Sequence, residues 1–122
     1  MTKHILLVDD DSGIRFALAL KLKTVGYAVS EATDGQEAID FFRDRSADLI
    51  IMDVGMPRMD GYTAAAALHG APATAEVPIL FLTAQNFELP AAVRPLVRRF
   101  AFLTKPLSPR DVIASVAQLL GG

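Results

Sequence analysis

The stretch Leu49-Ile50-Ile51-Met52-Asp53 consists of an apolar run, residues 49–52, followed directly by an aspartate. An unbroken run of large, branched side chains is typical of a strand that is buried on both faces of a sheet. Three similar runs predict buried strands at residues 5–8, 77–82 and 100–103. The more polar, alternating segment 27–32 is predicted to be an edge strand.

Helical patterns lie between these strands, and each has a residue that can cap its start. The capping residues are Asp11 or Ser12, Asp34 with Glu37 three positions later, Asp60, and Ser108. The first three helices are predicted to end near Val25, Arg45 and His69, with Gly26 directly after the first. The last helix begins at Pro109, and its apolar positions fall on one face.

Strand and helix therefore alternate five times along the chain. This order, with nearly continuous hydrophobic strands, predicts an α/β fold in which a parallel sheet lies between two layers of helices. Ligands in such doubly wound sheets bind outside the carboxyl ends of the strands. The residues that follow the strands are therefore the candidate site.

Polar residues with related chemistry follow four of the predicted strands. They are Asp9, Asp10 and Asp11 after the first strand, Asp53 after the third, Thr83 after the fourth and Lys105 after the fifth. Carboxylates gathered at one edge repel one another unless a cation compensates their charge. Mg²⁺ suits such a site, with Asp10 and Asp53 as ligands and Asp9 acting through water.

The hydroxyl of Thr83 and the ammonium of Lys105 could bind the oxygens of a phosphoryl group, and Asp53 would then be the nucleophile. Each residue also has an ordinary alternative. A single Asp after a strand is often a helix cap, the role that we assign to Asp11 and Asp60. Thr83 alone would be a loop residue and Lys105 alone a solvated lysine. The pattern as a whole favours phosphoryl chemistry.

The 122 residues allow one domain and little else, and 52% hydrophobic residues indicate a globular core. The net charge of −2 argues against direct binding of nucleic acid. The chain has no cysteine, and therefore neither a disulfide framework nor a thiolate metal site. The apolar run near the start is too short for a signal sequence or a membrane span, so we expect a cytoplasmic protein without membrane contact.

Several of these motifs together resemble the receiver domains of two-component response regulators, over residues 3–120. They are Leu7 to Asp11, Asp53-Val54-Gly55-Met56-Pro57-Arg58-Met59-Asp60-Gly61, Thr83-Ala84 and Lys105-Pro106. The resemblance implies a flavodoxin-like sheet of order 2-1-3-4-5 in a single receiver domain over residues 1–122. It also implies that the chain is a signalling switch rather than an enzyme acting on a separate substrate.

The resemblance implies a role for each site residue. Asp53 would accept a phosphoryl group from a histidine kinase or a histidine phosphotransfer protein and later catalyse its loss. Mg²⁺ would be bound by Asp10, Asp53 and the backbone carbonyl of Gly55, with Asp9 in the outer shell. Thr83 and Lys105 would bind the phosphoryl oxygens, Phe102 would turn inward with Thr83, and the Lys105-Pro106 bond would be cis.

The segment between Thr83 and Lys105 departs from the family pattern. Pro95 falls inside the expected fourth helix, which should therefore be short, kinked or displaced. Arg98-Arg99 replaces the usual Gly-Ala pair after that helix. Gly55 and Gln85 stand at positions that vary in the family, and both indicate an open site.

This part of the chain, with the last strand and helix, would form the surface that partners recognise. An unusual basic and aromatic output surface is predicted there, consisting of Arg94, Arg98, Arg99 and Phe100 beside Phe102. The alternative is that these arginines are merely solvated.

The prediction is a phosphorylated receiver that controls a downstream protein. The target would be a separate protein, or an output domain if Gly121-Gly122 marks the cut end of a longer protein. A homodimer formed through the output surface is left open. The main alternative is a receiver-like binding module that signals without phosphorylation. A small hydrolase is disfavoured, because related phosphatases place the nucleophile in an Asp-x-Asp motif after the first strand.

Overall fold

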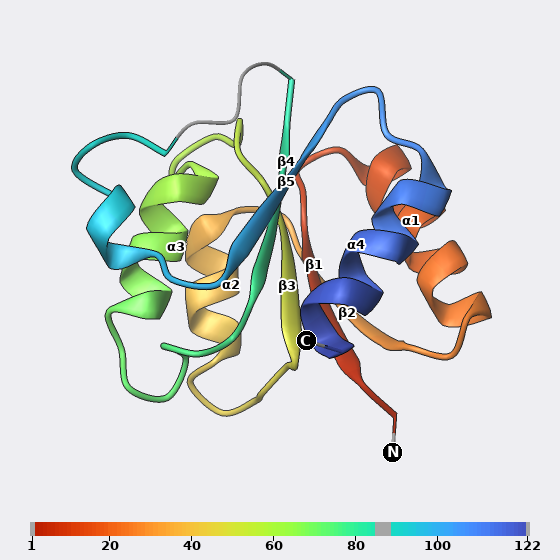
Figure 1. The fold of residues 1–122 in the computed structure, drawn as a ribbon, viewed down its shortest axis with the longest axis horizontal. Coiled ribbons are helices and arrows are strands. Elements are labelled where there is room, and N and C mark those ends of the chain that lie inside the picture. Colours follow the sequence, from red (N-terminus) through yellow and green to blue (C-terminus); the bar gives the residue numbers. More distant parts are fainter. Residues whose placement is uncertain (1, 85–88, 122) are drawn as a thin grey trace.

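The structure is a computed structural model that describes residues 2–84 and 89–121, and its centre is one five-stranded sheet (Figure 1). The strands are β1 (His4–Val8), β2 (Ala28–Ala32), β3 (Leu49–Asp53), β4 (Ile79–Thr83) and β5 (Phe100–Thr104). All neighbouring strands are parallel, in the order β2-β1-β3-β4-β5. The predicted doubly wound, flavodoxin-like order is confirmed.

Helices cover both faces of this sheet, as Figure 1 shows. Helices α1 (Ser12–Thr24) and α4 (Pro109–Gly121) lie on one face, and α2 (Gly35–Phe41) and α3 (Gly61–His69) lie on the other. Alternate side chains of the central strands fill the two cores, with Leu6 and Ile50 on the α2 and α3 side and Leu7 and Ile51 on the other. Because β3 is central and completely buried, its last residue is held firmly at the carboxyl edge.

The predicted caps are present. Asp11 accepts hydrogen bonds from the N–H groups of Gly13 and Ile14, and Asp60 accepts one from Thr63. Gly26 follows α1 with a φ of 106°, a conformation that glycine adopts without strain.

The predicted end of the second helix is wrong, because α2 ends at Phe41 and not near Arg45. Beyond that point the N–H groups of Phe42 and Arg43 donate to carbonyls only three residues back. Such bonds tighten the last turn and end the α-helical pattern.

Two of the strands begin slightly later than predicted. β2 begins at Ala28, one residue late, and β4 begins at Ile79 instead of Val77, because Pro78 has no N–H to donate to a neighbouring strand.

The segment between β4 and β5 lacks a regular helix among its described residues. In residues 89–99 the helical element is the short 3₁₀ helix η1 (Arg94–Leu96), which contains Pro95. Leu89 and Val97 are buried on either side of η1 and fasten the segment to the core. The prediction of a short, kinked or displaced fourth helix is confirmed: between β4 and β5 the described residues contain η1 where the fourth α-helix of five βα repeats was expected, and the helix after β5 is α4. Gln85 lies outside the described residues.

We find no helix in the described part of the chain that is long and apolar enough to cross a membrane.

Candidate functional site

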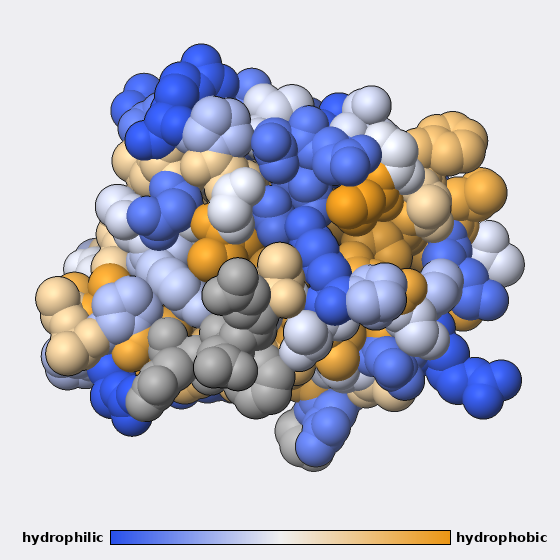
Figure 2. Space-filling model, turned by 90° about the horizontal axis from the view of Figure 1, so that it is seen from above, coloured by the Kyte–Doolittle hydropathy of each residue, from blue (hydrophilic) through white to orange (hydrophobic). Residues whose placement is uncertain are grey.

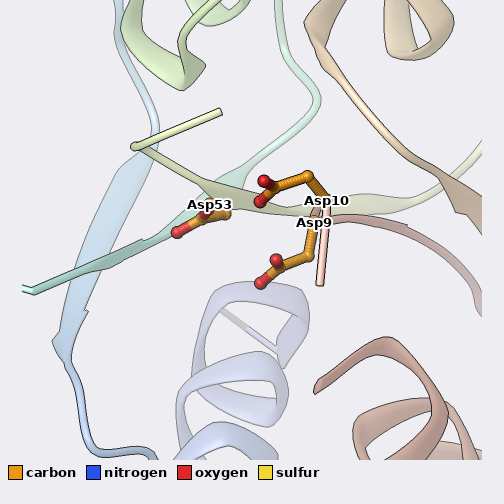
Figure 3. Close-up of side chains that lie close together, drawn as sticks. All are labelled: Asp9, Asp10 and Asp53. Carbon is orange, nitrogen blue, oxygen red and sulfur yellow. The ribbon is translucent and has the colours of Figure 1, made fainter. Parts of the chain in front are cut away.

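Three aspartates meet at the carboxyl edge of the sheet (Figure 3). Asp53 is the last residue of β3, and Asp9 and Asp10 directly follow β1. Because β1 and β3 are neighbours and Val8 lies beside Met52, the register brings these residues together. One carboxylate oxygen from each side chain lies within 4.8 Å of the others. The predicted carboxylate cluster is therefore present.

Asp9 is completely buried, and its two carboxylate oxygens differ in their surroundings. Oδ1 accepts the N–H of Asp11 at 2.9 Å, whereas Oδ2 has no hydrogen-bond partner among the described residues. Burial raises the pKa of Asp9 to about 6, the Asp11 N–H opposes this rise, and the nearby charge of Asp53 adds to it. An unpartnered buried oxygen in an all-oxygen cluster fits a hard divalent cation such as Mg²⁺.

Lys105 reaches this cluster from the end of β5. The Lys105-Pro106 peptide bond is cis, as the resemblance implied, and the Lys105 N–H donates to the Thr83 carbonyl at 2.8 Å. The ammonium Nζ lies 2.9 Å from Oδ1 of Asp53. Burial opposes the charge on Lys105, but the hydrogen bond and the charge of Asp53, together with Asp9 and Asp10, outweigh it and raise the pKa of Lys105.

Thr83 and Phe102 lie on the two strands beyond β3. Thr83 ends β4 and is buried; it directly follows Leu82, the residue that pairs with Asp53. Phe102 is half-buried in β5 and stacks on Phe81, with ring centroids 5.3 Å apart. Tyr62 of α3 contacts both rings edge-on, at 5.2 Å from Phe81 and 6.5 Å from Phe102. An aromatic cluster therefore extends from the site toward the surface of β5.

Two glycines near Asp53 have opposite surroundings. Gly55 is exposed, and a Cβ on it would meet no atom within 4 Å. Gly61 begins α3, and a Cβ there would lie 2.5 Å from the carbonyl oxygen of Asp53. The Gly61 N–H also donates to the Val54 carbonyl at 3.0 Å. Gly61 therefore lets α3 pack directly on the strand end that carries Asp53, a role that sequence reasoning missed.

A second contact that the sequence did not indicate holds the loop after β3. Arg58 has a φ of 66°, in the left-handed region, and its guanidinium pairs with the buried carboxylate of Asp34. Asp34 also accepts the Glu37 N–H as the cap of α2, and this bond, followed by the bond and charge of Arg58, holds the pKa of Asp34 below its usual value despite burial. The cap was visible in the sequence, but no signal identified Arg58 as its partner.

The residues of the predicted output surface lie in η1, in the segment that follows it and at the start of β5. Arg98 pairs with Glu76 at 3.3 Å, and Arg99 donates to the carbonyl of Leu119 at 2.7 Å. Arg94 lies in η1, and the ring of Phe100 is 5.6 Å from that of Phe102.

Seen from above, the surface of the molecule has a hydrophilic centre that is flanked by a hydrophobic area on the side of α1 and α4 (Figure 2).

Comparison with known proteins identifies the family. The sequence model of the response regulator receiver domain matches residues 5–117. The chain is 37% identical over 117 residues to a probable transcriptional regulator, ycf27, of Cyanidium caldarium. That match covers 96% of this chain and 46% of the relative, so the chain spans about half the length of the curated protein that it resembles.

Solved structures show the same fold. A putative response regulator from Chloroflexus aurantiacus superposes with a TM-score of 0.89 at 32% identity, over 100% of both chains. The receiver domain of the sensor histidine kinase PA1611 from Pseudomonas aeruginosa superposes with a TM-score of 0.87 at 25% identity, over 100% of both chains. The latter structure has a magnesium ion coordinated in its active-site cleft.

Proposed function

The chain belongs to the response regulator receiver domain family and is a signalling switch of two-component systems, and from this we propose that Asp53 is its phosphoacceptor. The observation that carries the proposal is the contact between Asp53 Oδ1 and Lys105 Nζ, 2.9 Å long, at the centre of the carboxylate cluster. A carboxylate paired with a fixed cation at a strand end is placed for covalent chemistry rather than for capping a helix.

In the proposed reaction a carboxylate oxygen of Asp53 forms a bond to phosphorus. The bond between phosphorus and the imidazole nitrogen of a phosphohistidine breaks, and its electron pair stays with that imidazole. The protonated ammonium of Lys105 would stabilise the negative charge on the oxygens of the transferred phosphoryl group. Its raised pKa favours this protonated form. Thr83, at the adjacent strand end, would donate its hydroxyl to another of these oxygens.

The donor set supports a Mg²⁺ site formed by Asp10, Asp53 and the backbone carbonyl of Gly55, with Asp9 acting through water. The ion would supply positive charge opposite the phosphoryl oxygens. Oδ2 of Asp9, which has no partner in the part of the chain that the structure describes, would accept a hydrogen bond from a water ligand of the ion. The open space beside Gly55 leaves the site accessible to a donor protein and to water, so we further propose that Asp53 loses its phosphoryl group by self-catalysed hydrolysis.

Receiver domains act between histidine kinases and downstream targets. For this chain we propose a histidine kinase or a histidine phosphotransfer protein as donor, and a downstream protein or a linked output domain as target, in the cytoplasm. Residues 1–122 would act as one receiver domain. Thr83 and Phe102 would turn toward phosphorylated Asp53, and the target would be recognised at the output surface, defined as Arg94, Arg98, Arg99 and Phe100. A homodimer through that surface would be the alternative assembly.

Phosphorylation is tested by incubating the protein with acetyl phosphate and Mg²⁺ and measuring its intact mass. A single phosphoryl adduct is expected, and it should be absent when the metal is chelated and in Asp53→Asn. The folded Asp60→Asn protein is a matched control, because Asp60 caps α3 outside the cluster, and it should still form the adduct. A folded wild-type protein that gains no adduct would favour a receiver-like binding module that signals without phosphorylation.

A further inference from the structure

His69 is a buried imidazole that the proposed phosphorylation does not use. It is the last residue of α3 and is 2% exposed. Its Nε2 lies 2.7 Å from the carbonyl oxygen of Val77, in the segment that leads into β4. The backbone N–H of Arg98, in the segment that leads into β5, donates to Nδ1 at 3.1 Å. One ring thus joins three separate parts of the chain.

The two backbone partners fix the protonation state of this ring. A carbonyl can only accept, so Nε2 must carry a proton, and an N–H can only donate, so Nδ1 must be an unprotonated acceptor. Only the neutral Nε2–H tautomer makes both bonds. A second proton on Nδ1 would face the Arg98 N–H, so protonation removes this partly buried bond and leaves the Arg98 N–H without its acceptor.

The hydrogen bond from the Arg98 N–H to His69 lies two residues before Phe100, the first residue of β5. The carbonyl of the next residue, Arg99, accepts the Ile79 N–H at 3.0 Å and so begins the pairing of β4 with β5. The described residues before it, 89–99, contain η1 but no α-helix that could hold this stretch in place. Val97 is buried, and His69 is the side chain that binds the backbone immediately after it.

We propose that His69 is a positioning residue that acts as a pH-dependent latch: its neutral ring ties the start of β5 to the end of α3, and its protonation releases residues 97–99. The latch does not depend on phosphorylation. Its effect on a partner does rest on the proposed function, because Arg98 and Phe100 belong to the output surface.

The charged groups on the elements around the ring are compatible with this latch. Glu76, beside Val77, pairs with Arg98, and Arg99 donates to backbone carbonyls, while Arg94 lies in η1. On α2, which packs against α3, Glu37 binds Thr33 and Asp40 pairs with Arg43. On α3 itself Asp60 caps the opposite end. Within the described residues, both hydrogen bonds of the ring are to backbone groups.

The experiment follows the Arg98 amide by NMR between pH 8 and pH 5 in the unphosphorylated protein. As the His69 ring signals titrate, the Arg98 amide signal should shift with the same midpoint. Its protection against hydrogen exchange, corrected for the intrinsic rate, should fall about fivefold to tenfold, as expected for the loss of one hydrogen bond. The amide signals of Val112 and Val116 in α4, buried on the opposite face of the sheet, serve as an internal reference.

Two variants separate a latch from a merely structural histidine. The side-chain amide of His69→Gln offers a donor and an acceptor but does not titrate, so the Arg98 protection should stay high and independent of pH. His69→Leu removes both bonds, so the Arg98 protection should be low at every pH. His4→Gln removes the other histidine and should leave the wild-type profile unchanged.

The proposal is overturned if Arg98 protection stays constant while the His69 ring titrates, or if the ring does not titrate before the protein unfolds. It is also overturned if His69→Gln keeps the wild-type pH profile. A failure of acetyl phosphate to modify Asp53 would leave all of these readings unaffected, so the two proposals fail separately.

Discussion

When no cation is bound, the ionised carboxylate of Asp9 lowers the stability of the folded protein. Its carboxylate is completely buried, one oxygen has no hydrogen-bond partner in residues 2–84 and 89–121, and burial raises its pKa from 3.8 to about 6. A carboxyl group with a raised folded pKa favours folding less as the pH rises, because the unfolded chain gives up the proton more readily. This loss of stability begins near the pKa of the group in the unfolded chain and is complete above its pKa in the folded protein.

Asp9→Asn should therefore stabilise the metal-free protein at pH 7, on the order of 2 kcal/mol. The amide can keep the bond from the Asp11 N–H and can donate to the neighbouring carboxylates. Urea unfolding in chelator is the measurement, repeated at pH 7 and pH 4.5. The gain should be smaller at the lower pH, and added Mg²⁺ should stabilise the variant less than the wild type. A gain of equal size at both pH values would contradict the assigned charge cost.

The junction of β3 and α3 shows how an element positions the site. A Cβ on Gly61 would meet two backbone atoms, the Asp53 carbonyl oxygen at 2.5 Å and the Val54 Cα at 3.1 Å, and neither can move aside as a side chain could. The helix start and the strand end are thus packed without room for a methyl group. Because Gly61 packs on the backbone of Asp53, a shift of α3 would displace Asp53. Its distance from Lys105, the residue that follows β5, would then change.

Gly61→Ala is expected to destabilise the protein by about 1–3 kcal/mol, the usual cost of overpacking, and to slow phosphorylation of Asp53. Helix propensity alone would predict the opposite sign for stability. Gly121→Ala is the matched control, since Gly121 is also helical and a Cβ there meets nothing within 4 Å. Thermal unfolding and the rate of adduct formation are compared. Equal stability of the two variants would show that the close packing at Gly61 is not a constraint.

Sequence reasoning worked best where one residue decides the local structure. The caps at Asp11, Asp34 and Asp60 and the carboxylates after β1 and β3 follow from local spacing and strand order, and the structure contains them. Pro95 likewise predicts a short, kinked or displaced fourth helix, and the short 3₁₀ helix η1 contains this proline.

Contacts between distant segments were not predictable in this way. The pairing of Arg58 with Asp34 and the bond of Arg98 to His69 join residues 24 and 29 positions apart. Periodicity and capping report only on neighbouring residues, so nothing in the local sequence marks such partners. The predicted end of α2 is also too late, because the N–H groups of Phe42 and Arg43 donate to carbonyls three residues back and local spacing does not mark that change.

Across the whole molecule, the aromatic cluster of Tyr62, Phe81, Phe100 and Phe102 connects the site with the output surface. Tyr62 is partly buried, and burial, together with the charge of Asp60, raises its pKa. Phe102 stacks on Phe81, which lies beside Met52, the residue before Asp53, and Tyr62 lies against the edge of the Phe102 ring. A rotation of Phe102 after phosphorylation would therefore change the surroundings of Tyr62.

The chain offers a direct optical measurement of this rotation, because it has no tryptophan and two tyrosines, Tyr27 and Tyr62. Adding acetyl phosphate and Mg²⁺ should change the tyrosine fluorescence. The change should persist in Tyr27→Phe and disappear in Tyr62→Phe. A change that follows Tyr27 instead would place the main rearrangement near β2 and contradict the proposed route through Phe102.

The central claim about function is that the Asp53 carboxylate carries the phosphoryl group. Borohydride reduces an acyl phosphate to the alcohol, so a phosphorylated aspartate becomes homoserine, which peptide mass spectrometry can locate. After treatment with acetyl phosphate and Mg²⁺ and then borohydride, the account predicts homoserine at position 53 and unchanged aspartate at positions 9 and 10. Homoserine at Asp9 or Asp10 with Asp53 unmodified, or no homoserine in a folded protein, would contradict it.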